Sequence, residues 1–189
     1  MIQHLQSKRR VYFTRQHLLP TAHNVRIFHD YFPKFILHLR DPRQVLISWT
    51  HFIEKFGQEN FKYISSDLHP PASYFSLPLE KKFDWQIAHF LPVVVQWMQA
   101  WTRVIDKNEF NILVTRYEDF VQDPERFIRK IAGFYDLKPP HVFLPEKNPK
   151  SYFRKGEKDE WKKMLSPRQI QRIHQIIPKS LLRRYNWES

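Results

Sequence analysis

The stretch FILHLRDPRQVLISW, residues 35–49, changes from a strand pattern to a helix pattern within a few residues. Residues 35–39 are mostly apolar, as in a parallel strand that is covered on both faces. Asp41 is a favourable N-cap and Pro42 a favourable first residue for the helix that follows. The stretch therefore predicts a buried strand that leads directly into a helix, with Arg40 at the junction.

The same two patterns recur along the rest of the chain. Strands are expected at residues 11–14, 35–39 and 111–115, and helices from residue 42, over about 81–107, from 123 and over 166–177. Residues 57–80 have no clear period and contain three prolines, so a long loop is expected there, a candidate lid over a site. The alternation of strands and helices predicts an α/β layered sheet with helices on its faces.

The apolar residues of the expected helices indicate which faces point inward. After Asp41 the inward residues are expected to be Val45, Trp49, Phe52 and Phe56, at helical spacing. In the next helix they are Ile87, Phe90, Leu91, Val94, Val95, Met98 and Trp101, and Pro92 is expected to kink that helix. In the helix after Asp123 they are Phe127, Ile128, Ile131 and Phe134.

The composition is that of a globular chain with an excess of positive charge. Its 189 residues fit a single domain, 1–189, and the absence of cysteine and of a long apolar run favours a cytoplasmic protein without a membrane span. The net charge of +12 comes from residues 1–43 and 147–184, which hold eight Lys/Arg against two Asp/Glu and twelve against three. Either these are two solvated basic faces, or both meet around one polyanion, which would be a nucleotide, a nucleic acid or a phospholipid surface.

Arg40 is the first candidate for an anion site, because ligands in open α/β sheets bind outside the carboxyl ends of the strands. The N–H groups and dipole of the helix that begins at Asp41 also favour an anion. Arg40 and Ser48 could share one phosphate. The alternative is that Arg40 pairs with a surface carboxylate and Ser48 has no special role. Only three glycines are present, so a glycine-rich phosphate loop is not formed by this chain.

Three other groups of residues are candidates for the same site. Arg154 and Lys155 are adjacent cations, and Gly156 lets a backbone approach a ligand closely, although a basic run is more often a solvated face. Tyr117 follows a strand and could bond a base or simply pack on the sheet. His17 could act as a general base because its ordinary pKa lies near neutrality. The histidine spacing predicts no metal site.

The order of these motifs resembles that of the sulfotransferases that use 3′-phosphoadenosine 5′-phosphosulfate (PAPS). The family's 3′-phosphate segment stands here as Arg40-Asp41-Pro42-Arg43 with Ser48, and its Tyr-Glu-Asp as Tyr117-Glu118-Asp119 before Asp123-Pro124. Its R-K-G-x-x-G-D-W-K stands as Arg154 to Lys162, with Asp159-Glu160 in place of Gly-Asp. Its Lys-Thr-His-Leu-Pro resembles Arg15-Gln16-His17-Leu18-Leu19-Pro20. The family's first strand and 5′-phosphosulfate loop are not found before Val11.

The resemblance implies a three-layer, mostly parallel α/β sheet of the P-loop nucleotide-kinase-like type, truncated at its amino end. It implies transfer of a sulfuryl group from PAPS to a hydroxyl or amine of a small-molecule or glycan acceptor, without a metal. His17 would be the base and Arg15 would stabilise charge, while Arg40, Ser48, Tyr117, Arg154, Lys155 and Gly156 would bind the nucleotide. The alternatives are a catalytically inactive fragment and a basic module that binds nucleotides or nucleic acid. The sequence leaves the acceptor and the oligomeric state open.

Overall fold

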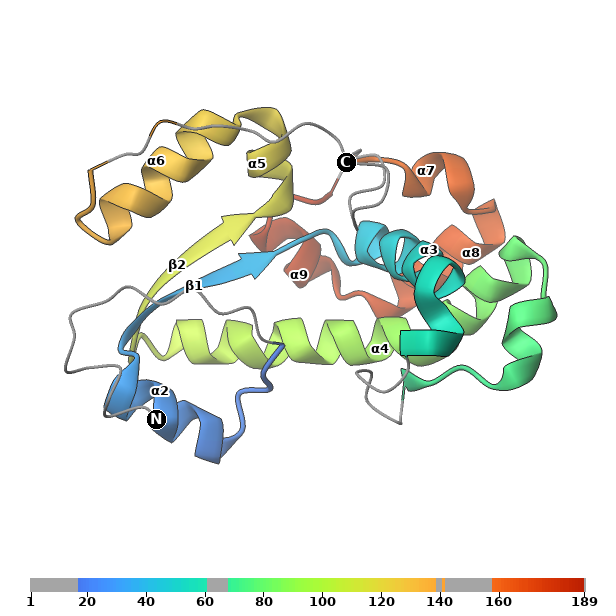
Figure 1. Ribbon diagram of the computed structural model, residues 1–189, viewed down its shortest axis with the longest axis horizontal. Coiled ribbons are helices and arrows are strands. Elements are labelled where there is room, and N and C mark those ends of the chain that lie inside the picture. Colours follow the sequence, from blue (N-terminus) through green and yellow to red (C-terminus); the bar gives the residue numbers. More distant parts are fainter. Residues whose placement is uncertain (1–16, 61–67, 139–140, 142–157, 189) are drawn as a thin grey trace.

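The structure is a computed structural model, and it describes residues 17–60, 68–138, 141 and 158–188 (Figure 1). Its elements are α2 (Ala22–Tyr31), β1 (Lys34–Leu39), α3 (Pro42–Asn60), the 3₁₀ helix η3 (Ala72–Ser76), α4 (Leu79–Asp106), β2 (Asn111–Arg116), α5 (Tyr117–Gln122), α6 (Pro124–Phe134), α7 (Trp161–Met164), α8 (Pro167–Ile176) and α9 (Lys179–Arg184). Among the described residues no helix has both the length and the apolar content to cross a bilayer.

β1 and β2 form a parallel pair in which Lys34 lies opposite Asn111 and Leu39 opposite Arg116. Leu37 and Leu39 are buried and pack on the core around α4, whereas His38 contacts Phe127 of α6 at 5.7 Å between ring centroids. Side chains therefore alternate between the two faces of the sheet. This confirms an α/β arrangement with a small parallel sheet (Figure 1). The larger three-layer sheet of P-loop kinase type stays a prediction.

Most of the expected elements are present. The strands at 35–39 and 111–115 are confirmed, as are the helices that begin near residues 42, 81, 123 and 166. The strand expected at 11–14 lies outside the described residues. Helices α2, α5, α7 and α9 were not expected. α2 had a local signal in Thr21, whose side chain accepts a hydrogen bond from the backbone N–H of Asn24.

Many of the core residues lie on α4, and the face of α4 that is buried is the one expected from the sequence. Pro92 lies inside α4, and the kink expected there stays a prediction. The buried core residues on α4 are Phe83, Ile87, Phe90, Leu91, Val95, Met98, Trp101 and Val104. Carboxyl-terminal residues pack against them, namely Ile173, Ile177, Leu181, Leu182, Tyr185 and Trp187. Residues 161–187 thus return to the core, close to α3 and α4 (Figure 1).

The inward face expected for α3 is wrong by one residue. Besides Gln44, the fully buried positions include Leu46, Ile47, Thr50 and Ile53. Trp49 is only partly buried and stacks between Phe52 and Phe90, with ring centroids 5.3 and 5.0 Å apart. The aliphatic side chains fill the core against α4, and the larger rings are left at the border of the α3–α4 contact. The expected inward residues of α6 are also only half-buried.

The expectation of a loop over residues 57–80 is also incorrect in part. α3 continues to Asn60, and residues 72–76 form a 3₁₀ helix whose Tyr74 is fully buried. Gln86 Nε2 donates a hydrogen bond to the Tyr74 hydroxyl at 3.0 Å, and Lys82 Nζ donates to the Phe75 carbonyl at 3.1 Å. Burial raises the pKa of Tyr74 to about 12. Residues 72–76 are therefore part of the packed interior and not a free lid.

Replacing Tyr74 with phenylalanine is expected to lower the free energy of unfolding by about 1–3 kcal/mol, because the Gln86 amide would be left buried without its acceptor. Urea unfolding measures the change. Ser76→Ala is the control, because Ser76 is exposed and its hydroxyl donates to the Ser73 carbonyl within the same short helix. Equal effects of the two substitutions would show that η3 is not held by the Tyr74 hydroxyl.

Candidate functional site

The carboxyl ends of β1 and β2 bring together two of the expected site residues. Leu39 is opposite Arg116, so the next residues along the chain, Arg40 and Tyr117, are neighbours. The guanidinium carbon of Arg40 lies 4.1 Å from the centroid of the Tyr117 ring. Such stacking holds an arginine in place without neutralising its charge. The sheet therefore presents a positive group at the edge where ligands of α/β proteins bind.

The remaining expected residues are less closely placed. Ser48 lies in the second turn of α3 and is partly exposed, and within the described ranges its hydroxyl makes no hydrogen bond. His17 is exposed and precedes Leu18, whose carbonyl accepts hydrogen bonds from Trp97 and Trp101 of α4 at 2.8 and 2.9 Å. Among the described residues, the hydrogen bonds of this segment are thus with α4 and α2 and not with Arg40. Arg15, Arg154, Lys155 and Gly156 lie outside the described residues.

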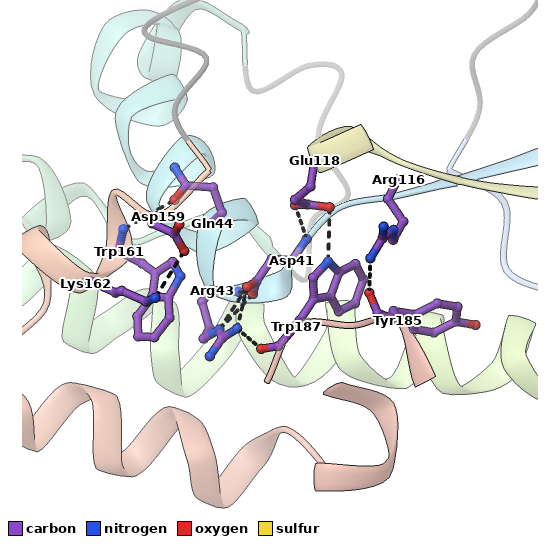
Figure 2. A network of polar contacts seen from close by, with 10 residues as sticks. All are labelled: Asp41, Arg43, Gln44, Arg116, Glu118, Asp159, Trp161, Lys162, Tyr185 and Trp187. Atoms are coloured by element: carbon purple, nitrogen blue, oxygen red, sulfur yellow. Dashed lines mark hydrogen bonds and ion pairs between the residues drawn. The ribbon is translucent and has the colours of Figure 1, made fainter. Parts of the chain in front are cut away.

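Glu118 joins three segments at this edge of the sheet (Figure 2). Its Oε1 accepts a hydrogen bond from the backbone N–H of Asp41 at 3.0 Å, and its Oε2 accepts one from the indole Nε1 of Trp187, also at 3.0 Å. One carboxylate thus fastens the start of α3 and the carboxyl-terminal tail to the end of β2.

Arg43, the second arginine of the motif, binds an anion that belongs to the protein. Its guanidinium, 3% exposed, donates to both carboxylate oxygens of Asp41, with an Nη2–Oδ2 distance of 2.6 Å. Nη2 also donates to the carbonyl of Trp187, and the guanidinium lies 4.0 Å from the Trp161 ring centroid. Arg43 is therefore a structural cation, and of the two arginines only Arg40 is placed beside a strand-end tyrosine.

The same contacts change the role expected for the start of α3. The N–H of Asp41 is bonded to Glu118, that of Arg43 is bonded to the Asp41 carboxylate, and Pro42 has none. The first three residues of the junction therefore have no N–H group left to offer a phosphate. These contacts favour side chains over the N–H groups of residues 41–43 as the partners of an anion at this edge.

Gln44 connects α3 to the segment that follows the R-K-G motif (Figure 2). Its Oε1 accepts from the backbone N–H of Trp161 at 3.3 Å. Its Nε2 donates to Glu160 Oε2, also at 3.3 Å. Gly156 precedes Lys158, the first described residue of this segment, by two positions in the sequence. Glu160 and Trp161, which follow the second basic motif in the sequence, therefore lie at the same end of α3 as Arg40.

Arg116 holds the tail from the other strand. It donates from Nε to Asp119 Oδ2 at 3.1 Å and from Nη1 to the carbonyl of Tyr185 at 2.8 Å. The hydrogen bond to Asp119 raises the pKa of Arg116. Both strand ends are thus tied to residues 185–187 (Figure 2).

Burial changes the acidity of two groups in this region. It raises the pKa of Asp41, against the hydrogen bonds and charge of Arg43. It lowers the pKa of His38, whose Nδ1 is 2.9 Å from the Thr115 hydroxyl; nearby Glu118 opposes this shift and Arg40 adds to it. The described residues contain no group of three or more His, Asp and Glu side chains that could hold a metal ion.

Sequence reasoning assigned no role to Glu118, Gln44 or Trp187. Glu118 was part of a recognised motif, but its two hydrogen bonds depend on segments 77 and 69 residues away. No local pattern signals such contacts. Arg43 was equally visible in the sequence, but only the fold shows that its partner is Asp41.

A family model described as "Sulfotransferase domain" matches residues 2–144, most of the chain. The chain belongs to the sulfotransferase domain family. It is also similar to Sulfotransferase 6B1 of Danio rerio, with 24% identity over 174 residues, which cover 79% of this chain and 52% of that protein. The chain therefore spans about half the length of the curated relative it matches. No solved structure matches it.

Membership of the sulfotransferase family confirms the resemblance drawn from the motif order. Both Arg40 and Tyr117 lie within the matched range, whereas Arg154, Lys155 and Gly156 lie beyond its end at residue 144. The family match thus covers the sheet edge and the stacked arginine, and the second basic motif is supported by sequence resemblance alone.

Proposed function

We propose that residues 1–189 form a single, partial sulfotransferase domain that binds PAPS and transfers its sulfuryl group to a hydroxyl or amine of a small-molecule or glycan acceptor. The observation that carries the proposal is the stacking of Arg40 on Tyr117 at the carboxyl edge of the sheet. A cytoplasmic location, expected from the absence of cysteine, is part of the proposal.

In this proposal the 3′-phosphate is bound by side chains. Arg40 binds two of its oxygens, and Ser48 adds a hydroxyl donor. Arg154, Lys155 and the Gly156 N–H also bind it. The support is that Glu160 and Trp161, a few positions later in the sequence, are bonded to Gln44 of α3. Tyr117 keeps Arg40 in position and faces the adenine. The support for this arrangement is that the N–H groups of Asp41 and Arg43 are already bonded within the protein and Pro42 has none, which favours side chains as partners of a phosphate.

Sulfuryl transfer then follows the logic of phosphoryl transfer, by in-line displacement with charge stabilised by cations. The acceptor oxygen or nitrogen forms a bond to sulfur as the bond from sulfur to the 5′-phosphate oxygen breaks, which releases adenosine 3′,5′-bisphosphate (PAP). His17 takes the proton that the acceptor loses, and Arg15 stabilises charge near the sulfuryl group. The exposed position of His17 leaves it accessible to an acceptor from solvent.

A second candidate is a catalytically inactive fragment, favoured by the finding that the chain spans only 52% of its relative. Removing one preorganised donor to transition-state charge typically slows an enzyme about 100- to 1000-fold. Binding of the nucleotide and turnover are therefore separate parts of the proposal and are tested separately.

Calorimetric titration with PAP is the test of the nucleotide site. PAP is expected to bind, and Arg40→Ala is expected to weaken binding about 10- to 100-fold, because a charge-assisted hydrogen bond is lost. Arg168→Ala is the matched control, since Arg168 is exposed on α8. AMP, which has no 3′-phosphate, should bind wild type and Arg40→Ala alike.

The other outcomes decide between the alternatives. Equal PAP affinity of wild type and Arg40→Ala would refute the 3′-phosphate site. PAP binding without product formation from PAPS across a panel of acceptors would identify the inactive fragment. Oligonucleotide binding that falls steeply with salt, with no preference for PAP over ATP, would identify a basic nucleic-acid module.

A further inference from the structure

A groove of about 720 Å³ lies between α2 and the last turns of α4, and the proposed nucleotide site makes no use of it. Its apolar lining includes Val25 of α2, Ala100 and Val104 of α4, and Phe110, which directly precedes β2. This volume is in the range of small-molecule sites, which are typically concave and largely apolar.

The groove is separate from the edge that carries Arg40. Phe110 lies just before the first residue of β2, whereas Tyr117 follows its last residue. At about 3.3 Å per residue, the length of β2 separates the two places by about 20 Å. In Figure 1, α2 lies beside the starts of both strands and the end of α4, away from the junction of β1 with α3.

The rim of the groove is positive. Arg26 on α2 and Arg103 and Lys107 at the end of α4 border it, together with His29 and one acid, Glu109. The Nε of Arg26 lies 4.0 Å from Oδ2 of Asp30, and the Arg26 side chain is highly exposed. In the part of the chain that the structure describes, Arg103 and Lys107 form no ion pair, although they stand one helical turn apart where like charges repel each other. The helix dipole favours cations at the end of α4 but does not account for Arg26 in the middle of α2.

We propose that this groove binds an anionic amphiphile as a free monomer, with the apolar chain along Val25, Val104 and Phe110 and the acid group between Arg103 and Lys107. An anion between these two cations relieves their mutual repulsion. The apolar lining takes a hydrocarbon body that a phosphate or nucleotide lacks. Since helices α2 and α4 border the groove on two sides, it accommodates one molecule and not the flat surface of a bilayer.

Dodecanoate is the probe, measured by calorimetry below its micellar concentration, with dodecyltrimethylammonium as a ligand of equal chain length and opposite charge. Dodecanoate is expected to bind one-to-one with a Kd on the order of 10 µM, within the range reached by ligands of this size. The cationic ligand is expected to bind at least about tenfold more weakly, since each like charge at the rim disfavours it.

Two variants test the placement. Arg103→Glu with Lys107→Glu reverses the rim charge at exposed positions and is expected to weaken dodecanoate binding about tenfold or more. Ala100→Trp fills the groove and is expected to weaken dodecanoate and the cationic ligand alike. Arg168→Glu with Lys179→Glu makes the same charge change on α8 and α9 and should leave binding unchanged.

The proposal is overturned if dodecanoate does not bind, if the rim and control variants behave alike, or if the cationic ligand binds equally well. Co-sedimentation of the chain with phosphatidylglycerol vesicles, lost in the rim variant while dodecanoate fails to bind, would assign the surface to a membrane instead. PAP binding plays no part in any of these outcomes, so a failure of the proposed function leaves this test intact.

Discussion

Replacing Arg43 with leucine lowers the free energy of unfolding by an expected 3–5 kcal/mol, roughly the effect of breaking a buried ion pair. The reason is that Asp41, 4% exposed, keeps its carboxylate but loses the guanidinium that bonds both of its oxygens. The Trp187 carbonyl loses a donor as well. Chemical denaturation at neutral pH measures the change. Arg129→Leu is the control, because Arg129 and Glu125 form an exposed pair worth about 0–1 kcal/mol.

The pH dependence of this variant gives a second measurement. Burial already raises the pKa of Asp41, and the hydrogen bonds and charge of Arg43 oppose this rise. Removing the Arg43 side chain therefore raises the pKa of Asp41 further. A carboxyl whose folded pKa lies above its unfolded value stabilises the fold at low pH and loses that contribution as pH rises through the folded pKa. The gap in stability between wild type and Arg43→Leu should therefore narrow as the pH falls from 7 towards 4. A gap that stays constant would show that Asp41 is not left charged and buried.

Asp41→Asn combined with Arg43→Leu separates charge burial from packing. The amide removes the uncompensated negative charge, so the double variant should be less destabilised than Arg43→Leu alone. If the double variant were as unstable as Arg43→Leu or less stable, an uncompensated charge on Asp41 would not be the reason that Arg43→Leu is destabilised.

Replacing Trp187 with alanine is expected to lower the free energy of unfolding by about 3–5 kcal/mol, as for other buried aromatic side chains. Trp187 is 3% exposed, packs against Tyr185 and donates to Glu118. Trp187→Phe keeps most of the packing but leaves Glu118 Oε2 without this donor, so a smaller loss of about 1–3 kcal/mol is expected. Urea unfolding measures both, and Leu137→Ala, at an exposed position, is the control.

Trp187→Phe also tests whether the carboxyl-terminal tail supports the nucleotide site. Glu118 holds the N–H of Asp41, next to Arg40, so loosening Glu118 should weaken PAP binding even when Trp187→Phe is fully folded. Circular dichroism establishes folding, and calorimetry gives the PAP affinity. Unchanged affinity in the folded Trp187→Phe variant would mean that Arg40 is positioned by Tyr117 alone.

Motif order in the sequence was enough to identify the family, because the motifs are short and their residues are adjacent. It did not indicate that Arg43 is used internally. Both arginines look alike in the sequence, yet one lies over a tyrosine at the sheet edge and the other is enclosed by Asp41, Trp161 and Trp187. Which arginine is enclosed depends on where Trp161 and Trp187, more than a hundred positions away, pack.

The sequence by itself determined the strand at residues 35–39, its junction with α3 and the inward stripe of α4, because side-chain period and helix capping act between near neighbours. Tertiary structure decided which side of α3 is buried and placed Tyr74 in the interior. It also decided that Glu118 and Arg43 bind the carboxyl-terminal tail to the sheet edge. Those outcomes depend on competition among distant segments for the same buried space and the same few polar partners, which no local pattern records.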